Sequence, residues 1–237
     1  MTEFDTTVLE VIQRTPGVKS FRFKAQEDAF FEAGQYFLLT IKVNDVEETK
    51  PFSFSNSPTE KGYIEFTKRI TASDFSRTLD GLGKGDKAHI KMPYGSFTLD
   101  ESREKIAFLS GGIGITPVRS MCKFAADMKL PVRIVLLYGN NSAQDIIFKY
   151  DFEDMRKKNR NFRAVYTLTS LEKAPRIKAC RLGYIDGNMI REEVPDFTDR
   201  VFYLCGPPEM VRCLRDILKT GLNLPEDRIK TEKFAGY

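Results

Sequence analysis

Residues 110–117 read SGGIGITP, and this stretch decides the class of the second half of the chain. The short apolar segment Ile106–Leu109 precedes it, and helical spacing of apolar residues begins at Pro117, a residue well tolerated at a helix start. Glycines let backbone N–H groups approach a phosphate, and a helix N-terminus favours negative charge. A strand, a glycine-rich turn and a helix in this order predict a nucleotide-binding turn. The alternative is a tight connection without a ligand, and the usual G-x-G-x-x-G fingerprint is absent.

Strand-like and helix-like segments alternate beyond this turn. Apolar strand patterns cover residues 132–138, 162–168 and 201–205, and helical patterns cover residues 117–129, 147–158 and 208–218. Alternating strands and helices predict an α/β doubly wound parallel sheet, here of about five strands.

The first hundred residues follow a different pattern, with polar and apolar residues alternating over short segments. Such segments cover residues 19–24, 35–41 and 63–67, turn signals such as Pro16-Gly17 separate them, and residues 74–81 fit one short helix. This spacing predicts an antiparallel barrel or sandwich. A length of 237 residues corresponds to roughly 1.6 average domains, so to one large or two small ones. The change of pattern after about Asp100 favours two, at 1–101 and 102–237.

Composition excludes several classes of protein. The chain has 37 Lys and Arg against 33 Asp and Glu, with both signs interspersed, and the one basic cluster at 156–160 is expected to be a solvated helix face. We therefore expect no nucleic-acid partner. No apolar run reaches the roughly 18–20 residues that span a bilayer, and residues 1–25 lack a signal-peptide pattern. A cytoplasmic protein without membrane insertion is expected.

Cysteine and histidine usage argues against a metal site. The four cysteines, Cys122, Cys180, Cys205 and Cys213, have no zinc or iron–sulfur spacing, and His89 is the only histidine. His89 lies in an alternating segment and is expected to be a structural or surface residue. Cys205 ends a predicted parallel strand, where α/β sheets bind ligands, although a buried apolar cysteine is the equal alternative.

Several motifs occur in an order that resembles the two-domain ferredoxin–NADP reductase superfamily of flavoenzymes. They are Gly34-Gln35-Tyr36, Lys50-Pro51-Phe52-Ser53, Thr67-Lys68-Arg69, the glycine turn, Cys205-Gly206-Pro207-Pro208-Glu209-Met210 and Glu232-Lys233-Phe234. The resemblance covers nearly the whole chain. It implies a six-stranded antiparallel β-barrel that binds FAD, followed by an NAD(P)-binding α/β domain.

The resemblance also implies roles for residues of the first domain. Lys50 would meet the FAD pyrophosphate, Phe52 would lie against one flavin face, and the Ser53 hydroxyl would lie near flavin N5. Further FAD-binding residues would be Pro51, Thr67, Lys68, Arg69 and Ser76.

In the second domain, the resemblance implies that Cys205 stands beside nicotinamide C4 and that Glu232 joins a polar cluster with Ser53. These three residues are the expected catalytic group, without a metal. Phe234 matches an aromatic residue that covers the second flavin face in many relatives. The remaining dinucleotide-binding residues would be Gly111, Gly112, Gly114, Thr116, Gly206 and Pro207.

The chain departs from the family motif R-x-Y-S at two positions. Lys50 replaces the arginine and gives a point charge in place of a bidentate fork. Phe52 replaces the tyrosine, and Ser73 stands where relatives often have glycine in the phosphate loop. These changes are expected to affect how tightly FAD is held.

The resemblance implies an NAD(P)H-dependent flavoprotein reductase that passes electrons to a separate acceptor, such as an acidic ferredoxin-like protein. NADH is favoured over NADPH, because residues 138–145 contain no basic side chain that would bind a 2′-phosphate. The Asp145 carboxylate could instead accept a hydrogen bond from a ribose hydroxyl. Arg163 or Arg176 folding back onto a 2′-phosphate is the alternative. Two other functions stay open, a free-flavin reductase and a non-catalytic electron-transfer subunit of a larger complex.

Overall fold

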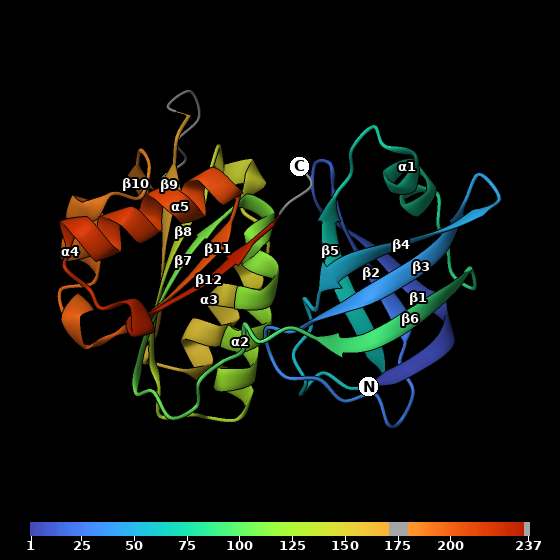
Figure 1. Ribbon diagram of the computed structural model, residues 1–237, viewed down its shortest axis with the longest axis horizontal. Helices are drawn as coiled ribbons and strands as arrows, with labels where there is room; N and C mark the ends of the chain where they lie inside the picture. The colour runs from blue at the N-terminus through green and yellow to red at the C-terminus, as the bar shows by residue number, and fades with distance from the viewer. Residues whose placement is uncertain (171–179, 235–237) are drawn as a thin grey trace. The chain divides into compact units, whose positions relative to one another are not determined.

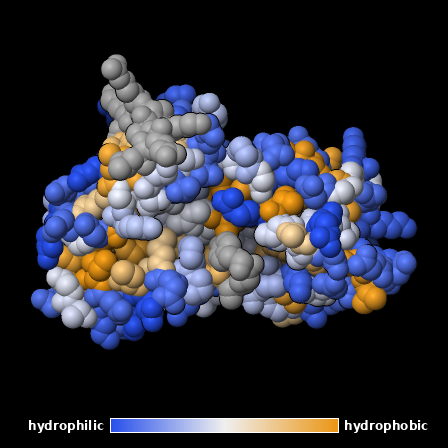
Figure 2. Space-filling model, turned by 90° about the horizontal axis from the view of Figure 1, so that it is seen from above, coloured by the Kyte–Doolittle hydropathy of each residue, from blue (hydrophilic) through white to orange (hydrophobic). Residues whose placement is uncertain are grey.

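A computed structural model of the chain describes residues 1–170 and 180–234 (Figure 1). Backbone contacts divide it into two compact units, one of residues 1–99 with 119–124 and the other of residues 100–118 with 125–237. Within the described residues, no helix is long and apolar enough to cross a membrane. Hydrophilic side chains cover most of the face seen in Figure 2, with apolar groups in small areas between them.

The first unit is an antiparallel sheet of six strands with one short helix. These elements are β1 (Thr2–Thr15), β2 (Val18–Lys24), β3 (Tyr36–Val43), β4 (Val46–Ser53), β5 (Tyr63–Arg69), α1 (Asp74–Asp80) and β6 (Lys87–Tyr94). The strand order is β4-β3-β6-β1-β2-β5, so β4 and β5 are the two edges. Just beyond β4, the Ser55 amide donates to the Glu65 carbonyl at 2.8 Å, which brings the two edges together. The sheet is thus curled, and the predicted antiparallel fold is confirmed.

Aromatic side chains fill the core of this unit. Phe21, Phe37 and Phe66 are fully buried, and the ring centroids of Phe21 and Phe66 lie 5.1 Å apart. Burying one such side chain stabilises the fold by about 1.5–3 kcal/mol. Pro51 lies in edge strand β4, and an edge strand is where a sheet tolerates a residue that has no backbone N–H.

The second unit is a parallel sheet of six strands with helices on both faces (Figure 1). Its strands are β7 (Lys105–Gly111), β8 (Arg133–Asn140), β9 (Phe162–Leu168), β10 (Cys180–Leu182), β11 (Val201–Gly206) and β12 (Ile229–Lys233). Its helices are α2 (Ile115–Asp127), α3 (Lys149–Lys158), α4 (Gly187–Glu193) and α5 (Pro208–Asp216), the last continued by a π-helical turn, Ile217–Gly221.

The strand order of this sheet is β10-β9-β8-β7-β11-β12. Successive strands are therefore added on one side of β7 up to β10, and β11 and β12 are added on its other side. The parallel α/β prediction is confirmed, and the structure has six strands where about five were expected. The three-residue strand β10 is too short to show a periodic pattern. One apolar cluster packs α4 and α5 against alternate residues of the strands, including Leu109, Leu137 and Leu204.

Candidate functional site

The residues predicted to bind FAD lie on β4, β5 and α1 of the first unit. The Phe52 ring is half-buried, with its centroid 4.2 Å from that of Phe66 on β5 and 6.0 Å from that of Phe75 on α1. The Lys50 ammonium lies 6.0 Å from the Phe75 ring centre, and its side chain is 51% exposed. The structure thus gathers Lys50, Phe52 and the start of α1 in one area.

The hydroxyl groups in this area already have backbone partners. Ser73 caps α1 and accepts a hydrogen bond from the Ser76 amide, while the buried Ser76 hydroxyl accepts one from the Thr71 amide at 2.8 Å. Ser73 is therefore the helix cap at the position where relatives often have glycine. Ser76 holds the same turn, and its predicted contact with a pyrophosphate stays a prediction.

Strand β5 contributes the buried Thr67 hydroxyl and two cations to this area. The Thr67 hydroxyl is 2.6 Å from that of Ser20 and 3.0 Å from that of Ser55. The Lys68 ammonium donates to the Arg69 carbonyl, and burial lowers the pKa of Lys68. Basic side chains beside an aromatic ring fit a flavin dinucleotide. The basic groups can donate charge-assisted hydrogen bonds to its pyrophosphate, and the aromatic ring can stack on its flavin.

The glycine turn lies at the carboxyl ends of the parallel strands in the second unit. Gly112 has a φ of +52°, and a Cβ added there would meet nothing within 4 Å, so a ligand has room beside this backbone. A Cβ at Gly114 would instead lie 2.5 Å from the Cys205 carbonyl oxygen. Gly114 is therefore required for the turn to pack on β11, a role that the sequence pattern does not distinguish from phosphate binding.

Two hydroxyls hold this turn in place. The Tyr138 hydroxyl donates to the Gly112 carbonyl at 2.9 Å, and the buried Thr116 hydroxyl donates to the Ile113 carbonyl. Sequence reasoning missed Tyr138. Its place at the end of an apolar strand, next to Gly139, is the signal that marks it as facing the carboxyl edge of the sheet.

Cys205 and Glu232 face each other across the β11–β12 ladder. Burial raises the pKa of the Glu232 carboxyl to about 7, and burial together with the Glu232 charge holds the pKa of the Cys205 thiol well above its usual range. Cys205 is thus a neutral thiol at pH 7, which suits positioning rather than nucleophilic attack. Gly206 follows with a φ of +155°, and its carbonyl accepts the Phe234 amide at 3.2 Å, which fixes Phe234 beside the end of β11.

Pro207 leads into α5, and Met210 on its first turn lies against the glycine turn. A Cβ at Gly111 would come within 2.3 Å of the Met210 sulfur, the far end of a flexible side chain. Ser53 is 6% exposed and belongs to the first unit. Its predicted cluster with Glu232 stays a prediction.

Arg163 does not reach the carboxyl edge of the sheet. It pairs with Val135 near the amino end of β9, and its guanidinium forms an ion pair with Glu193 at 2.7 Å. The structure therefore holds Arg163 away from the carboxyl edge, and the alternative that it folds back onto a 2′-phosphate stays untested. Arg176 lies outside the described residues. Asp145 accepts hydrogen bonds from the amide and the hydroxyl of Ser142, which orients its carboxylate in the turn after β8.

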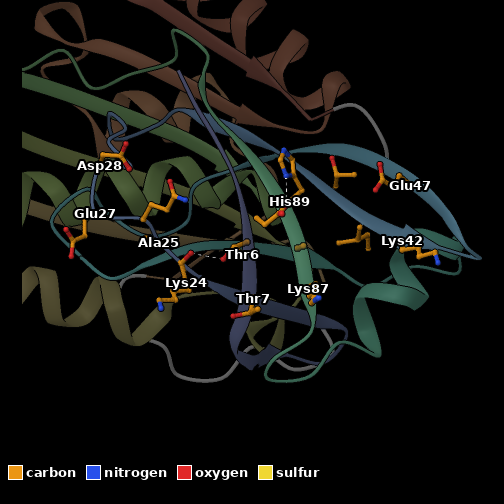
Figure 3. A pocket seen from close by; sticks show the side chains of 15 residues that line it. Thr6, Thr7, Lys24, Ala25, Glu27, Asp28, Lys42, Glu47, Lys87 and His89 are labelled. Atoms are coloured by element: carbon orange, nitrogen blue, oxygen red, sulfur yellow. Dashed lines mark hydrogen bonds and ion pairs between the residues drawn. The ribbon is translucent and has the colours of Figure 1, made fainter.

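A surface hollow of about 970 Å³ lies elsewhere on the first unit, lined by residues of β1, β3, β4 and β6 and of the end of β2 with the segment after it (Figure 3). Charged side chains of both signs line it, and the predicted FAD-binding residues lie outside its lining. His89 lies in it and hydrogen-bonds Asp5 at 2.8 Å and Glu3 at 3.1 Å, contacts that raise the pKa of His89. These contacts agree with a surface role for the histidine.

Comparison with known proteins matches both halves of the chain. Residues 5–99 match the oxidoreductase FAD-binding domain family, and residues 108–216 match the oxidoreductase NAD-binding domain family. The chain belongs to the ferredoxin–NADP reductase superfamily. The chain thus carries an oxidoreductase FAD-binding domain followed by an oxidoreductase NAD-binding domain.

Individual superfamily members are similar over most of the chain. The glycine betaine monooxygenase reductase subunit of Pseudomonas aeruginosa is 30% identical over 89% of this chain and 59% of that protein. The reductase component of propane 2-monooxygenase from Rhodococcus jostii is 29% identical over 97% of this chain and 63% of that protein. The chain thus spans less than two thirds of these relatives. The crystal structure of the Amycolatopsis cytochrome P450 reductase GcoB has a TM-score of 0.84 at 27% identity, covering 99% of this chain and 71% of that chain.

Proposed function

We propose that this protein is an FAD-dependent NADH oxidoreductase that supplies electrons to a separate acceptor. The observation that supports it most is the pairing, in one chain, of an FAD-binding sheet with a parallel sheet carrying a glycine turn and a buried thiol. We propose domain limits of 1–101 and 102–237. Bound FAD supplies the redox chemistry, since flavin accepts a hydride from a nicotinamide and gives electrons onward.

The side chains have separate tasks in this proposal. Lys50 holds the FAD pyrophosphate, and Phe52 lies against one flavin face. Thr67, Lys68 and Arg69 form the strand that meets the ribityl–pyrophosphate region. Ser53 places a hydroxyl beside the atom that receives the hydride, and Cys205 holds the nicotinamide edge as a neutral thiol. Glu232 is close to half-protonated at pH 7, so it can exchange a proton with its surroundings in either direction. Phe234 covers the flavin until the nicotinamide takes its place.

NADH is the proposed donor. Asp145 presents a carboxylate in the turn after β8, where an added 2′-phosphate would be repelled and a ribose hydroxyl would donate a hydrogen bond. Arg163, the basic alternative within the described part of the second unit, is held by Glu193. The matched relatives are named as reductase components of oxygenases, which supports a separate redox protein as acceptor, a ferredoxin-like protein being the finer proposal.

An anaerobic titration of the purified protein with NADH and then NADPH tests this function. The expected result is a flavin spectrum that bleaches near one equivalent of NADH, with a much slower response to NADPH. A colourless protein that turns over NADH only with added free flavin would instead indicate a free-flavin reductase. A protein that oxidises NADH under neither condition would indicate a non-catalytic subunit.

A further inference from the structure

Ser110, the last residue before the glycine turn, carries a buried hydroxyl group without a protein partner. The residue is fully buried, and its Oγ has no hydrogen-bond partner among the described residues. Leaving a buried hydroxyl unpaired costs about 1–3 kcal/mol. Folding alone gives no reason to place a serine rather than an alanine at this position.

The position of Ser110 in the sheet puts this hydroxyl beside the proposed reaction site. In the parallel ladders, Ser110 pairs with Cys205 on β11 and with Tyr138 on β8, and Cys205 pairs with Glu232. Register partners in neighbouring strands point to the same face of a sheet. One hydroxyl, one thiol and one carboxyl therefore form a row at the carboxyl edge, which is where open α/β sheets bind their ligands.

The other hydroxyls around the turn are already used. Tyr138 donates to Gly112 and Thr116 donates to Ile113, so both stabilise the turn itself. The backbone at Gly112 is the part of the turn with open space beside it, which suits the pyrophosphate. Ser110 pairs in the β7–β11 ladder with Cys205, the residue proposed to hold the nicotinamide edge.

We propose that the Ser110 hydroxyl hydrogen-bonds the carboxamide group of the nicotinamide and orients the ring against Cys205. A carboxamide offers both a donor and an acceptor, and a serine hydroxyl can accept and donate in return. Ser110 is thus a binding and positioning residue. This inference rests on the proposed function, because it requires a nicotinamide beside Cys205.

The test compares two ligands that differ in the nicotinamide. The dissociation constants of NAD⁺ and of ADP-ribose, which lacks the nicotinamide, are measured by calorimetry for the full-length wild type and Ser110→Ala. We expect Ser110→Ala to weaken NAD⁺ binding about 5–10-fold, the effect of losing one hydrogen bond, and to leave ADP-ribose binding unchanged. Its Tm should equal or exceed that of the wild type, since only an unpaired hydroxyl is removed.

Two further variants keep the result interpretable. Ser110→Thr retains the hydroxyl and should bind NAD⁺ within about twofold of the wild type. Thr15→Val removes another buried hydroxyl without a partner among the described residues, on β1 of the first unit, and should leave both dissociation constants unchanged.

Three results would overturn the inference. Equal weakening of both ligands would show that Ser110 only shapes the turn, and no change in either would show that its hydroxyl contributes no contact with the nicotinamide. Wild-type protein that binds ADP-ribose and NAD⁺ equally would show that the nicotinamide adds no net binding free energy, which the inference requires. A wild type that binds neither ligand would contradict the proposed function itself, which distinguishes the two failures.

Discussion

Glu232 shows how one residue makes the second unit sensitive to pH. Its carboxyl is neutral in acid, and burial raises its pKa to about 7 from an ordinary value of 4.5. Between these two pH values the folded protein holds the proton more firmly than the unfolded chain does. The contribution of Glu232 to the free energy of unfolding is therefore fully present below pH 4.5 and is lost as the pH rises through 7.

Glu232→Gln should remove this dependence, because the amide stays neutral. Thermal melts at pH 5.5, 7 and 8 should show the wild-type Tm falling more steeply with pH than that of the variant. Glu226→Gln is a suitable control, since Arg215 and Lys219 lower the pKa of Glu226 and its contribution is lost only in acid. If Glu232→Gln keeps the full wild-type slope, the Glu232 carboxyl does not carry the effect.

At the scale of secondary-structure elements, Glu65 joins three strands of the first unit and the segment after a fourth. This carboxylate on β5 is 1% exposed and accepts hydrogen bonds from Arg14 on β1 at 3.0 Å and from Arg22 on β2 at 2.8 Å. It also accepts the Ser55 hydroxyl, just beyond β4, at 2.8 Å. Removing one partner of a fully buried ion pair costs about 3–5 kcal/mol, but both guanidinium groups here still reach water.

We therefore expect Glu65→Gln to destabilise the protein by about 2 kcal/mol, a fall in Tm of about 4–8 °C for a chain of this length that unfolds as one unit. Glu10→Gln is the matched control, because Glu10 also pairs with Arg22, at 2.9 Å, but is 54% exposed. Its effect should stay within about 0.5 kcal/mol. Equal melting temperatures for the two variants would show that the buried position of Glu65 adds nothing.

Elements with strong local signals are those that the sequence predicts well. The helices after the glycine turn and after Pro207 follow from proline at or near their start and from apolar spacing, and the strands of the parallel sheet follow from apolar runs. The fourteen residues of β1 mix charged and apolar side chains along a strand that pairs with β2 on one side and β6 on the other. No single period describes such a strand, so the sequence pattern missed it.

The candidate site was only partly predictable for a related reason. The sequence places Cys205 at a strand end and Glu232 in a motif shared with the family, but their elevated pKa values depend on burial and on the adjacency of β11 and β12. Likewise, Ser110 lies beside Cys205 only because β7 and β11 are neighbours, although some ninety residues separate them along the chain. Strand order is a tertiary property that local patterns do not contain.

At the scale of the whole molecule, the proposed function requires FAD to stay on the protein while electrons leave it. NADH gives up two electrons as a hydride, whereas ferricyanide takes one, so two ferricyanide ions should be reduced per NADH. After desalting, the rate per mole of wild-type protein should not change when free FAD is added. Lys50→Ala removes a cation proposed to hold the pyrophosphate, so its rate should fall after desalting and recover with added FAD. His89→Gln alters only the surface hollow and should behave as the wild type does. If the wild-type rate also rises in proportion to free FAD, flavin is a substrate and the protein is a free-flavin reductase.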